Sequence, residues 1–262
     1  TRLQGDWSSD VCSSDLTLRK IWLSHLTTIK SSYCSFYREF LLVLSQAFCD
    51  MSANGGGWTL VARFSNSDSK NWMRDDAYWW YSILSSQGSP TSTTSNYDMI
   101  SEAFWSVRGT ELKVTRSDDR SNTGLLRTYT NCMGSRTLRS FLSSYGRFSY
   151  RNVWSNDMCL GSCPVYFGGA YSSTAGFSQA NCDGNIQRRN RIGFWCQWST
   201  GDGSVMMFGG GGVNCARADH GIGITENDYG GFQVWSDYGE QDFGNDASSV
   251  STSSYSLNLW IR

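Results

Sequence analysis

The 262-residue sequence has only two prolines and two histidines, and 17% of its residues are charged. Its formal net charge of −1 gives no reason to expect nucleic acid or an anionic membrane surface as a partner. Low charge with 15% aromatic residues also argues against disorder, which requires low hydrophobicity and high charge. With 27 glycines added, the composition predicts a loop-rich folded chain with aromatic packing.

Signatures of the common catalytic classes are missing as well. The sequence contains no GxSxG elbow and no HExxH motif, and the four glycines 209–212 lack the Lys-Ser/Thr of a phosphate-binding loop. Asp219 and His220 are adjacent, so in extended backbone their side chains point to opposite faces and form a poor proton relay. We therefore expect no enzymatic activity.

No apolar run is long enough to span a bilayer: the longest candidate, Phe40–Phe48, is far too short. No Asn-x-Ser/Thr sequon is present either. Nine cysteines favour disulfides and an oxidising compartment over zinc, because the CLGSC pair Cys159 and Cys163 cannot close a tetrahedral site alone. We expect a secreted, extracellular protein without membrane insertion.

The N-terminal residues differ in texture from the rest. The block GDWSSDVCSSDL, Gly5–Leu16, resembles the in-frame translation of a sequencing-library adaptor, with an acidic, serine-rich linker as the alternative. We interpret residues 1–16 as adaptor-derived and residues 17–46 as non-native or read-through sequence. The domain proper then covers 47–262.

Local patterns from Ala47 onwards predict short strands and few helices. Residues 47–65 indicate a strand, a glycine turn and a second strand, and Trp58–Phe64 alternates as a half-buried strand does. Residues 85–98 are typical of a polar loop, 123–130 of a strand and 137–146 of a short helix. Together they predict one α+β domain with a mainly antiparallel sheet, long glycine-rich loops and disulfides.

Several segments carry a family resemblance. The residues CDM…GGGWTLVARF resemble the opening of fibrinogen-related domains, and GGGWTLVA is especially similar to the intelectin branch. Thr200–Ala216 resembles that family's calcium-loop region, Asp228–Gly239 an intelectin segment with a calcium ligand and an aromatic wall, and Tyr255–Arg262 the closing strand. The resemblance covers 47–262 and implies a single fibrinogen C-terminal-like domain that lacks its N-terminal part. In this family the cysteine at the position of Cys49 pairs with an upstream cysteine, so the resemblance implies an orphaned Cys49, although Cys34 could substitute.

Carboxylates interleaved with glycine suit calcium, which takes six to eight oxygen ligands from flexible turns. Six of them fall within a short C-terminal stretch: Asp202, Asp219, Glu226, Asp228, Asp242 and Asp246. The alternative is that they are solvated loop residues. His220 is as well explained by a structural role as by metal ligation.

The resemblance transfers to single residues only in part. Asp228 matches an intelectin-type calcium ligand, and Asp202 opens the acidic loop, but Gly203 and Ser204 stand where further acidic residues follow in the family. The predicted metal ligands are Asp202, Asp219, His220, Glu226 and Asp228. Trp235 and Tyr238 correspond to the aromatic part of a glycan pocket, with ordinary core packing as the alternative.

These features predict a calcium-dependent lectin-like or adhesion module of innate-immunity type. Its partners would be glycans or extracellular glycoproteins, with possible homo-oligomers formed through the missing upstream segment. The alternative is a structural extracellular-matrix protein that binds protein partners and uses calcium only for stability. The ending ADHGIGITE…YSLNLWIR is similar to that of coral-type secreted matrix proteins.

Overall fold

The structure of the protein is a computed structural model that describes residues 33–37, 44–65, 83–145, 158–168, 188, 190–197, 203–209, 220–224, 241–243 and 255–262. The elements in the first half of the chain are β1 (Tyr33–Tyr37), β2 (Leu44–Asp50), η2 (Ala53–Gly55), β3 (Trp58–Phe64), β4 (Met99–Ile100), α2 (Ala103–Ser106), β5 (Leu112–Arg116) and β6 (Leu126–Thr128). Those in the second half are α3 (Leu138–Leu142), η3 (Ser143–Tyr145), β7 (Met158–Phe167), β8 (Arg191–Gln197), β9 (Gly203–Phe208), β10 (His220–Ile224), β11 (Gln241–Phe243) and β12 (Leu257–Ile261).

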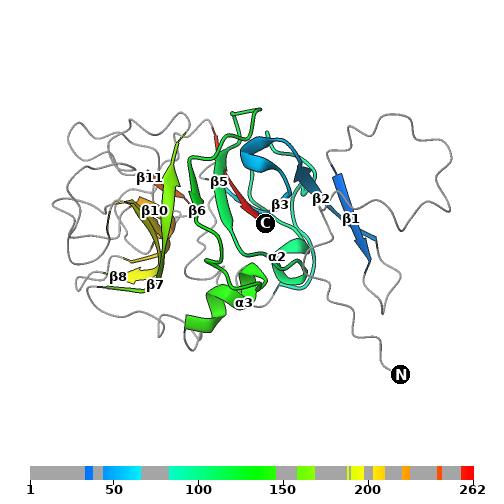
Figure 1. Ribbon diagram of the computed structural model, residues 1–262. Coiled ribbons are helices and arrows are strands. Elements are labelled where there is room, and N and C mark those ends of the chain that lie inside the picture. The colour runs from blue at the N-terminus through cyan, green and yellow to red at the C-terminus, as the bar shows by residue number, and fades with distance from the viewer. Residues whose placement is uncertain are drawn as a thin grey trace, which may run out of the picture.

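One sheet joins these strands in the order β1-β2-β3-β12-β5-β6-β7-β8-β9-β10-β11, and β4 pairs with β3 beside this path. Every neighbouring pair is antiparallel except β10 and β11, which run parallel. In Figure 1, β3, β12 and β5 occupy the middle of the molecule, with β7 to β11 on one side and β1 and β2 on the other. The C-terminal strand is therefore central.

The α+β prediction is wrong. Strands make up 47% of the residues whose structure can be interpreted and helices 12%, so this is a sheet-rich fold. The short helix predicted within 137–146 exists, but α3 spans only Leu138–Leu142 before a 3₁₀ turn. Thr137 caps α3 by accepting a hydrogen bond from the Ser140 amide at 3.1 Å. The fold class differs from the prediction because β7 and β8, in the middle of the chain, are strands that the sequence analysis did not predict.

The hairpin predicted at residues 47–65 is confirmed as β2, η2 and β3, but the half-buried alternation of β3 is not. All seven residues of β3 are buried, including the fully buried Arg63. The polar loop 85–98 covers the second face of the sheet there. Arg63 donates hydrogen bonds to the carbonyl oxygens of Tyr97, Ser92 and Ser89 at 2.8, 2.6 and 3.4 Å. Burial lowers the pKa of Arg63 to about 10, although nearby Asp98 opposes this, so the guanidinium stays charged.

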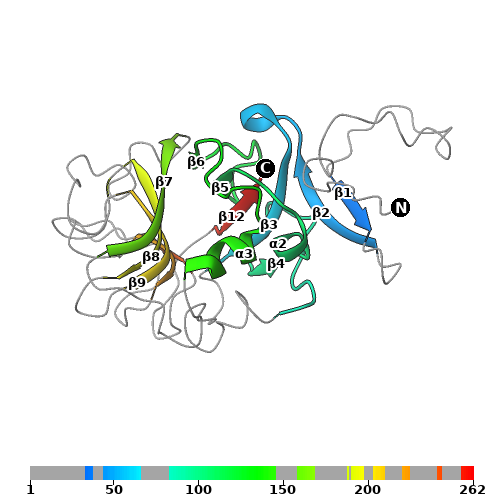
Figure 2. The same cartoon turned by 60° about the horizontal axis from the view of Figure 1, so that its bottom comes forward.

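Helices α2 and α3 lie side by side against the sheet (Figures 1 and 2). Their buried aromatic residues, Phe104 of α2 and Phe141 of α3, belong to the main hydrophobic core. Phe141 packs edge-to-face on Phe194 of β8, with ring centroids 4.8 Å apart. The Trp195 indole donates a hydrogen bond to the Leu142 carbonyl at 3.1 Å, which ties β8 to the end of α3.

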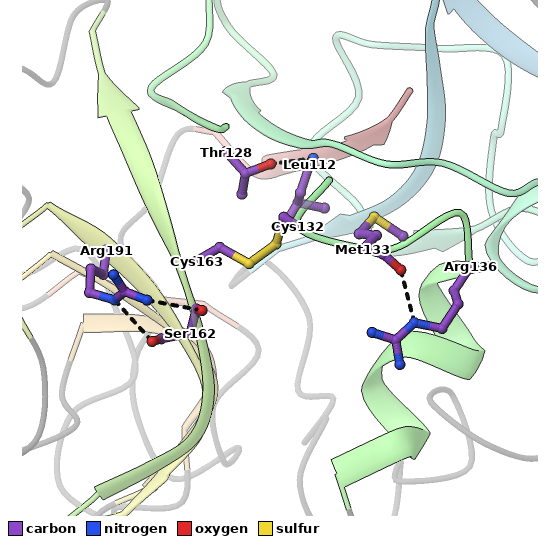
Figure 3. The surroundings of a disulfide bond; sticks show 8 residues. All are labelled: Leu112, Thr128, Cys132, Met133, Arg136, Ser162, Cys163 and Arg191. Atoms are coloured by element: carbon purple, nitrogen blue, oxygen red, sulfur yellow. Dashed lines mark hydrogen bonds between the residues drawn. A yellow bond between two sulfur atoms is a disulfide. The ribbon is translucent and has the colours of Figure 1, made fainter. Parts of the chain in front are cut away.

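Two disulfides attach β7 to its surroundings. Cys132–Cys163 joins the segment after β6 to β7 (Figure 3), and Cys159–Cys196 joins β7 to β8. The two cysteines of the CLGSC motif, Cys159 and Cys163, are therefore not bonded to each other but belong to two separate disulfides. This confirms the prediction of disulfides.

Cys49 is also disulfide-bonded, so the expectation of an orphaned Cys49 is wrong, and the alternative of a substitute partner agrees with the structure. Its partner lies outside the described side chains. Residues 33–37, which the sequence interpretation places before the domain, form β1 and pair with β2, with Cys34 opposite Ala47. The domain boundary at residue 47 stays a prediction.

Candidate functional site

Of the predicted site residues, His220 falls within the described part of the chain, as the first residue of β10. Its side chain is not described. The other predicted residues lie outside the described residues: Asp202, Asp219, Glu226, Asp228, Trp235 and Tyr238. Their roles therefore stay predictions, and the geometry of the strands next to them is what the structure adds.

In the glycine-rich sequence that follows the four glycines 209–212, residues 220–224 form a strand, β10, between β9 and β11. Gly221 shows why a glycine stands in this strand. A Cβ atom on Gly221 would lie 1.8 Å from the Met206 carbonyl oxygen on β9, far inside van der Waals contact. One of the glycines beside His220 thus serves the close approach of two strands, independently of any ligand.

The strand register shows which predicted ligands are connected to the same end of the β9–β10–β11 group of strands and which to the opposite end. Ile224, the last residue of β10, pairs with Ser204 near the start of β9, while Ile222 pairs with Phe243 at the end of β11. Asp202 directly precedes β9 and Glu226 closely follows β10, so both attach at this end. Asp219 attaches at the opposite end of β10, about 13 Å away along the strand.

Ser204 of β9, which pairs with Ile224 at the end of β10, is a further residue with a side-chain oxygen at this end. It is fully buried, and within the described part of the chain its hydroxyl oxygen Oγ has no hydrogen-bond partner. A buried hydroxyl without a partner is costly, and a bound cation or water would satisfy it. This orphaned oxygen fits an oxygen-liganded ion such as calcium. The described residues contain no group of three or more His, Cys, Asp or Glu side chains that could hold a metal.

Lys113 on β5 is a buried ionisable group whose pKa shift raises the question of a catalytic role. Burial lowers its pKa to about 8, against the effect of Asp50, and a lysine of lowered pKa is a potential nucleophile. Its Nζ lies 3.1 Å from Asp50 Oδ2 and between the rings of Trp58 and Trp260, 4.9 and 4.8 Å from their centroids. Because Lys113 is fully buried, no substrate reaches it, and its role is structural.

Sequence reasoning missed an exposed aromatic pair, Tyr129 and Tyr166, whose ring centroids lie 3.8 Å apart. Hydrogen bonding to Tyr166 raises the pKa of Tyr129 above its ordinary value. The alternation of β7, with Cys163 and Val165 buried and Pro164 and Tyr166 exposed, was the available signal. It became readable only once β7 was known to be a strand.

No protein-family model matches the chain, and no curated protein matches it at a significant level. The resemblance to fibrinogen-related domains therefore rests on the quoted residues alone. None of the helices among the described residues is long and apolar enough to cross a membrane. Together with the disulfides, that finding is compatible with an extracellular protein.

Proposed function

We propose that the protein is a secreted, calcium-dependent carbohydrate-binding module of fibrinogen-related, intelectin-like type, without catalytic activity. The observation that carries this proposal is the pairing at the end of β10. There the register brings Ile224 beside Ser204, and β11 runs parallel to β10. Segments bearing Asp202, Glu226 and Asp228 therefore begin from one end of neighbouring strands, and oxygen ligands from several turns are what calcium requires.

Within this proposal, Asp202, Glu226 and Asp228 hold the ion together with the orphaned Ser204 hydroxyl. Calcium would supply open coordination positions for two neighbouring hydroxyl groups of a sugar. Trp235, in the segment between β10 and β11, would provide an aromatic face for the apolar side of the ring. Tyr238 closely precedes Gln241, which pairs with His220, and so attaches at the other end of β10. Asp219 and His220 attach at the other end of β10, which favours a structural role for both.

Thermal unfolding with calcium and with EDTA tests the metal. An ion that binds only the folded state at 100 times its Kd stabilises it by about 2.7 kcal/mol, so calcium is expected to raise Tm by several degrees. Asp228→Ala should abolish the rise. The matched control is Asp118→Ala, an exposed aspartate whose carboxylate bonds to Arg116; its rise in Tm should match that of the unsubstituted chain. No calcium effect in the unsubstituted chain would overturn the proposal.

A glycan array or column, run with calcium and with EDTA, tests the ligand. A lectin is released by EDTA or by competing sugar, whereas a matrix protein that uses calcium only for stability does not bind the sugar. Trp235→Ala should weaken binding about tenfold without changing the calcium effect on Tm. Stabilisation by calcium without any sugar binding would favour the matrix function.

A further inference from the structure

The outward side of β7 carries an exposed aromatic platform. Tyr166 is 47% exposed and Tyr129, just after β6, is 42% exposed. The two rings are tilted by 30° with their centroids 3.8 Å apart, and the Tyr129 amide is held by the Pro164 carbonyl at 3.2 Å. Large exposed rings fixed by main-chain contacts form a ready surface for a partner, because little conformational entropy is lost on binding.

Two arginines flank the platform. The Arg127 guanidinium lies over the Tyr166 ring, 5.5 Å from its centroid, and donates a hydrogen bond to the Asn54 carbonyl. Arg191, opposite Pro164 in the register, donates to the side-chain and main-chain oxygens of Ser162 at 2.9 and 3.2 Å, as Figure 3 shows. Arg127 pairs with no carboxylate of the described residues, so its charge is available to an anion.

The surrounding sequence is strongly basic although the whole chain is not. Residues 120–201 contain nine arginines, no lysine and two aspartates, a formal charge of 9 − 2 = +7, in a chain whose net charge is −1. The remaining residues therefore sum to −8. This excess of positive charge in one part of the sequence favours an anionic partner over a neutral one.

We propose that the tyrosine face, formed by Arg127, Tyr129, Tyr166 and Arg191, binds an acidic oligosaccharide carrying carboxylate or sulfate groups. The apolar face of a sugar ring packs on the tyrosine pair. Arg127 binds an acidic group through the N–H donors that its hydrogen bond to Asn54 leaves, and Arg191, held by Ser162, adds positive charge beside it. A single-stranded nucleic acid would need a basic groove along its backbone, whereas here two arginines flank one pair of rings.

This face is separate from the proposed calcium site. Tyr166 lies near the end of β7, and Met158 at its start is next to Gln197 of β8, which pairs with Gly203 of β9. The eight residue steps along β7 from Met158 to Tyr166 correspond to about 26 Å. The inference therefore does not rest on the proposed calcium-dependent function, and binding here should persist in EDTA.

Calorimetric titration of the full chain in EDTA tests it, with a heparin octasaccharide and an octagalacturonate as probes and a neutral chitin-derived oligosaccharide for comparison. Tight binding of both acidic sugars, without binding of the neutral one, would show that either a carboxylate or a sulfate on the sugar is recognised, and binding of heparin alone would assign the face to sulfated sugars. Tyr166→Ala and Arg127→Gln should each weaken binding about tenfold. Tyr97→Ala, which removes an exposed tyrosine elsewhere, should leave Kd unchanged within twofold.

Three results would overturn the proposal: neither acidic sugar binds, Tyr166→Ala binds as tightly as the unsubstituted chain, or polyglutamate or single-stranded DNA of equal charge binds as tightly as the sugars. Tyr166→Phe keeps the ring and should retain binding within about threefold, which guards against a variant that loses affinity through misfolding. Loss of calcium stabilisation together with retained acidic-sugar binding would defeat only the calcium proposal.

Discussion

At the scale of single residues, Asp50 is the most constrained carboxylate of the described chain. Its Oδ1 accepts hydrogen bonds from the amides of Ser52 and Ala53 at 3.0 and 2.9 Å, and its Oδ2 pairs with Lys113. Burial alone would raise the pKa of Asp50, but these hydrogen bonds and the charge of Lys113 lower it below its ordinary value of 3.8. At neutral pH both members of the buried pair are therefore charged.

Asp50→Asn should lower the free energy of unfolding by about 3–5 kcal/mol at pH 7, because it leaves the Lys113 charge buried without a carboxylate. A carboxyl whose pKa is lower in the folded state stabilises the fold above its unfolded pKa, and that contribution is lost as pH falls below about 4. The variant should therefore depend less on pH below 4 than the unsubstituted chain. Urea unfolding at several pH values measures both effects.

The control for this variant is Asp118→Asn, at a carboxylate 41% exposed, which should change the free energy of unfolding by less than about 1 kcal/mol. Equal stability of Asp50→Asn and the unsubstituted chain at pH 7 would contradict a stabilising role for the pair.

Gly221→Ala should destabilise the chain by about 1–3 kcal/mol, because the added Cβ meets the Met206 carbonyl oxygen and forces β9 and β10 apart. Gly168→Ala is the matched control: its Cβ would lie 3.4 Å from the nearest atom, an ordinary contact, so a change below about 0.5 kcal/mol is expected. Thermal unfolding of the two variants under one buffer condition compares them. Equal Tm values would mean that the β9–β10 approach is not tight.

At the scale of elements, β7 is the strand that joins the two parts of the sheet. It pairs with β6 through its last residues and with β8 along most of its length. Both disulfides described with their partners involve β7, one towards the segment after β6 and one towards β8. The disulfides therefore reinforce the junction at which β7 joins β6 to β8. Without them, the β6 side of this junction would depend on the hydrogen bonds of only three β6 residues.

Replacing both cysteines of the Cys132–Cys163 bridge by alanine should cost about 3–4 kcal/mol, since the bridge closes a separation of 31 residues in the unfolded chain. The Cys159–Cys196 pair, separated by 37 residues, should cost about as much. Denaturant unfolding without reductant measures both. In excess dithiothreitol, each double variant should unfold like the unsubstituted chain, and a persisting difference would assign the loss to packing.

At the scale of the whole molecule, the C-terminal strand β12 lies between β3 and β5 in the centre of the sheet (Figure 2). All five of its residues are fully buried. Trp260 Nε1 donates to Thr115 Oγ1 at 2.9 Å, and Arg262 pairs with Glu111. The centre of the sheet is therefore complete only when β12 has paired with β3 and β5. We expect slow folding, because these contacts join residues distant in sequence.

Deletion of residues 255–262 should prevent folding altogether, because β3 and β5 would each lose a neighbouring strand and expose buried apolar surface. Circular dichroism and resistance to proteolysis would report the loss. Arg262→Ala keeps the strand but removes the ion pair with Glu111, the side-chain hydrogen bonds to the Asn54 and Gly56 carbonyls and the contact with the Trp58 ring, so it should fold with a loss of about 1–3 kcal/mol. A folded deletion variant would show that β12 is dispensable.

Local sequence patterns were sufficient for much of the sheet's first half and its closing strand. Trp58–Phe64 and the apolar run within Tyr255–Arg262 form strands as predicted, because apolar and aromatic residues alternate with other residues there; three glycines precede the first run and a serine-rich segment precedes the second. The strand expected within 123–130 and the helix within 137–146 are also present, both shorter than predicted. For the candidate site, the sequence supplied residue types, and only His220 has a described position.

What the sequence determined by itself was the location of these strands and turns, since backbone preferences and alternation act over a few residues. What the tertiary structure alone decided was which faces are covered. Alternation in β3 predicted one face towards solvent, yet Arg63 and Asn258 are fully buried because main-chain carbonyls of loop 85–98 accept their hydrogen bonds. Burial of a polar side chain depends on partners distant in sequence, and no local pattern encodes those partners.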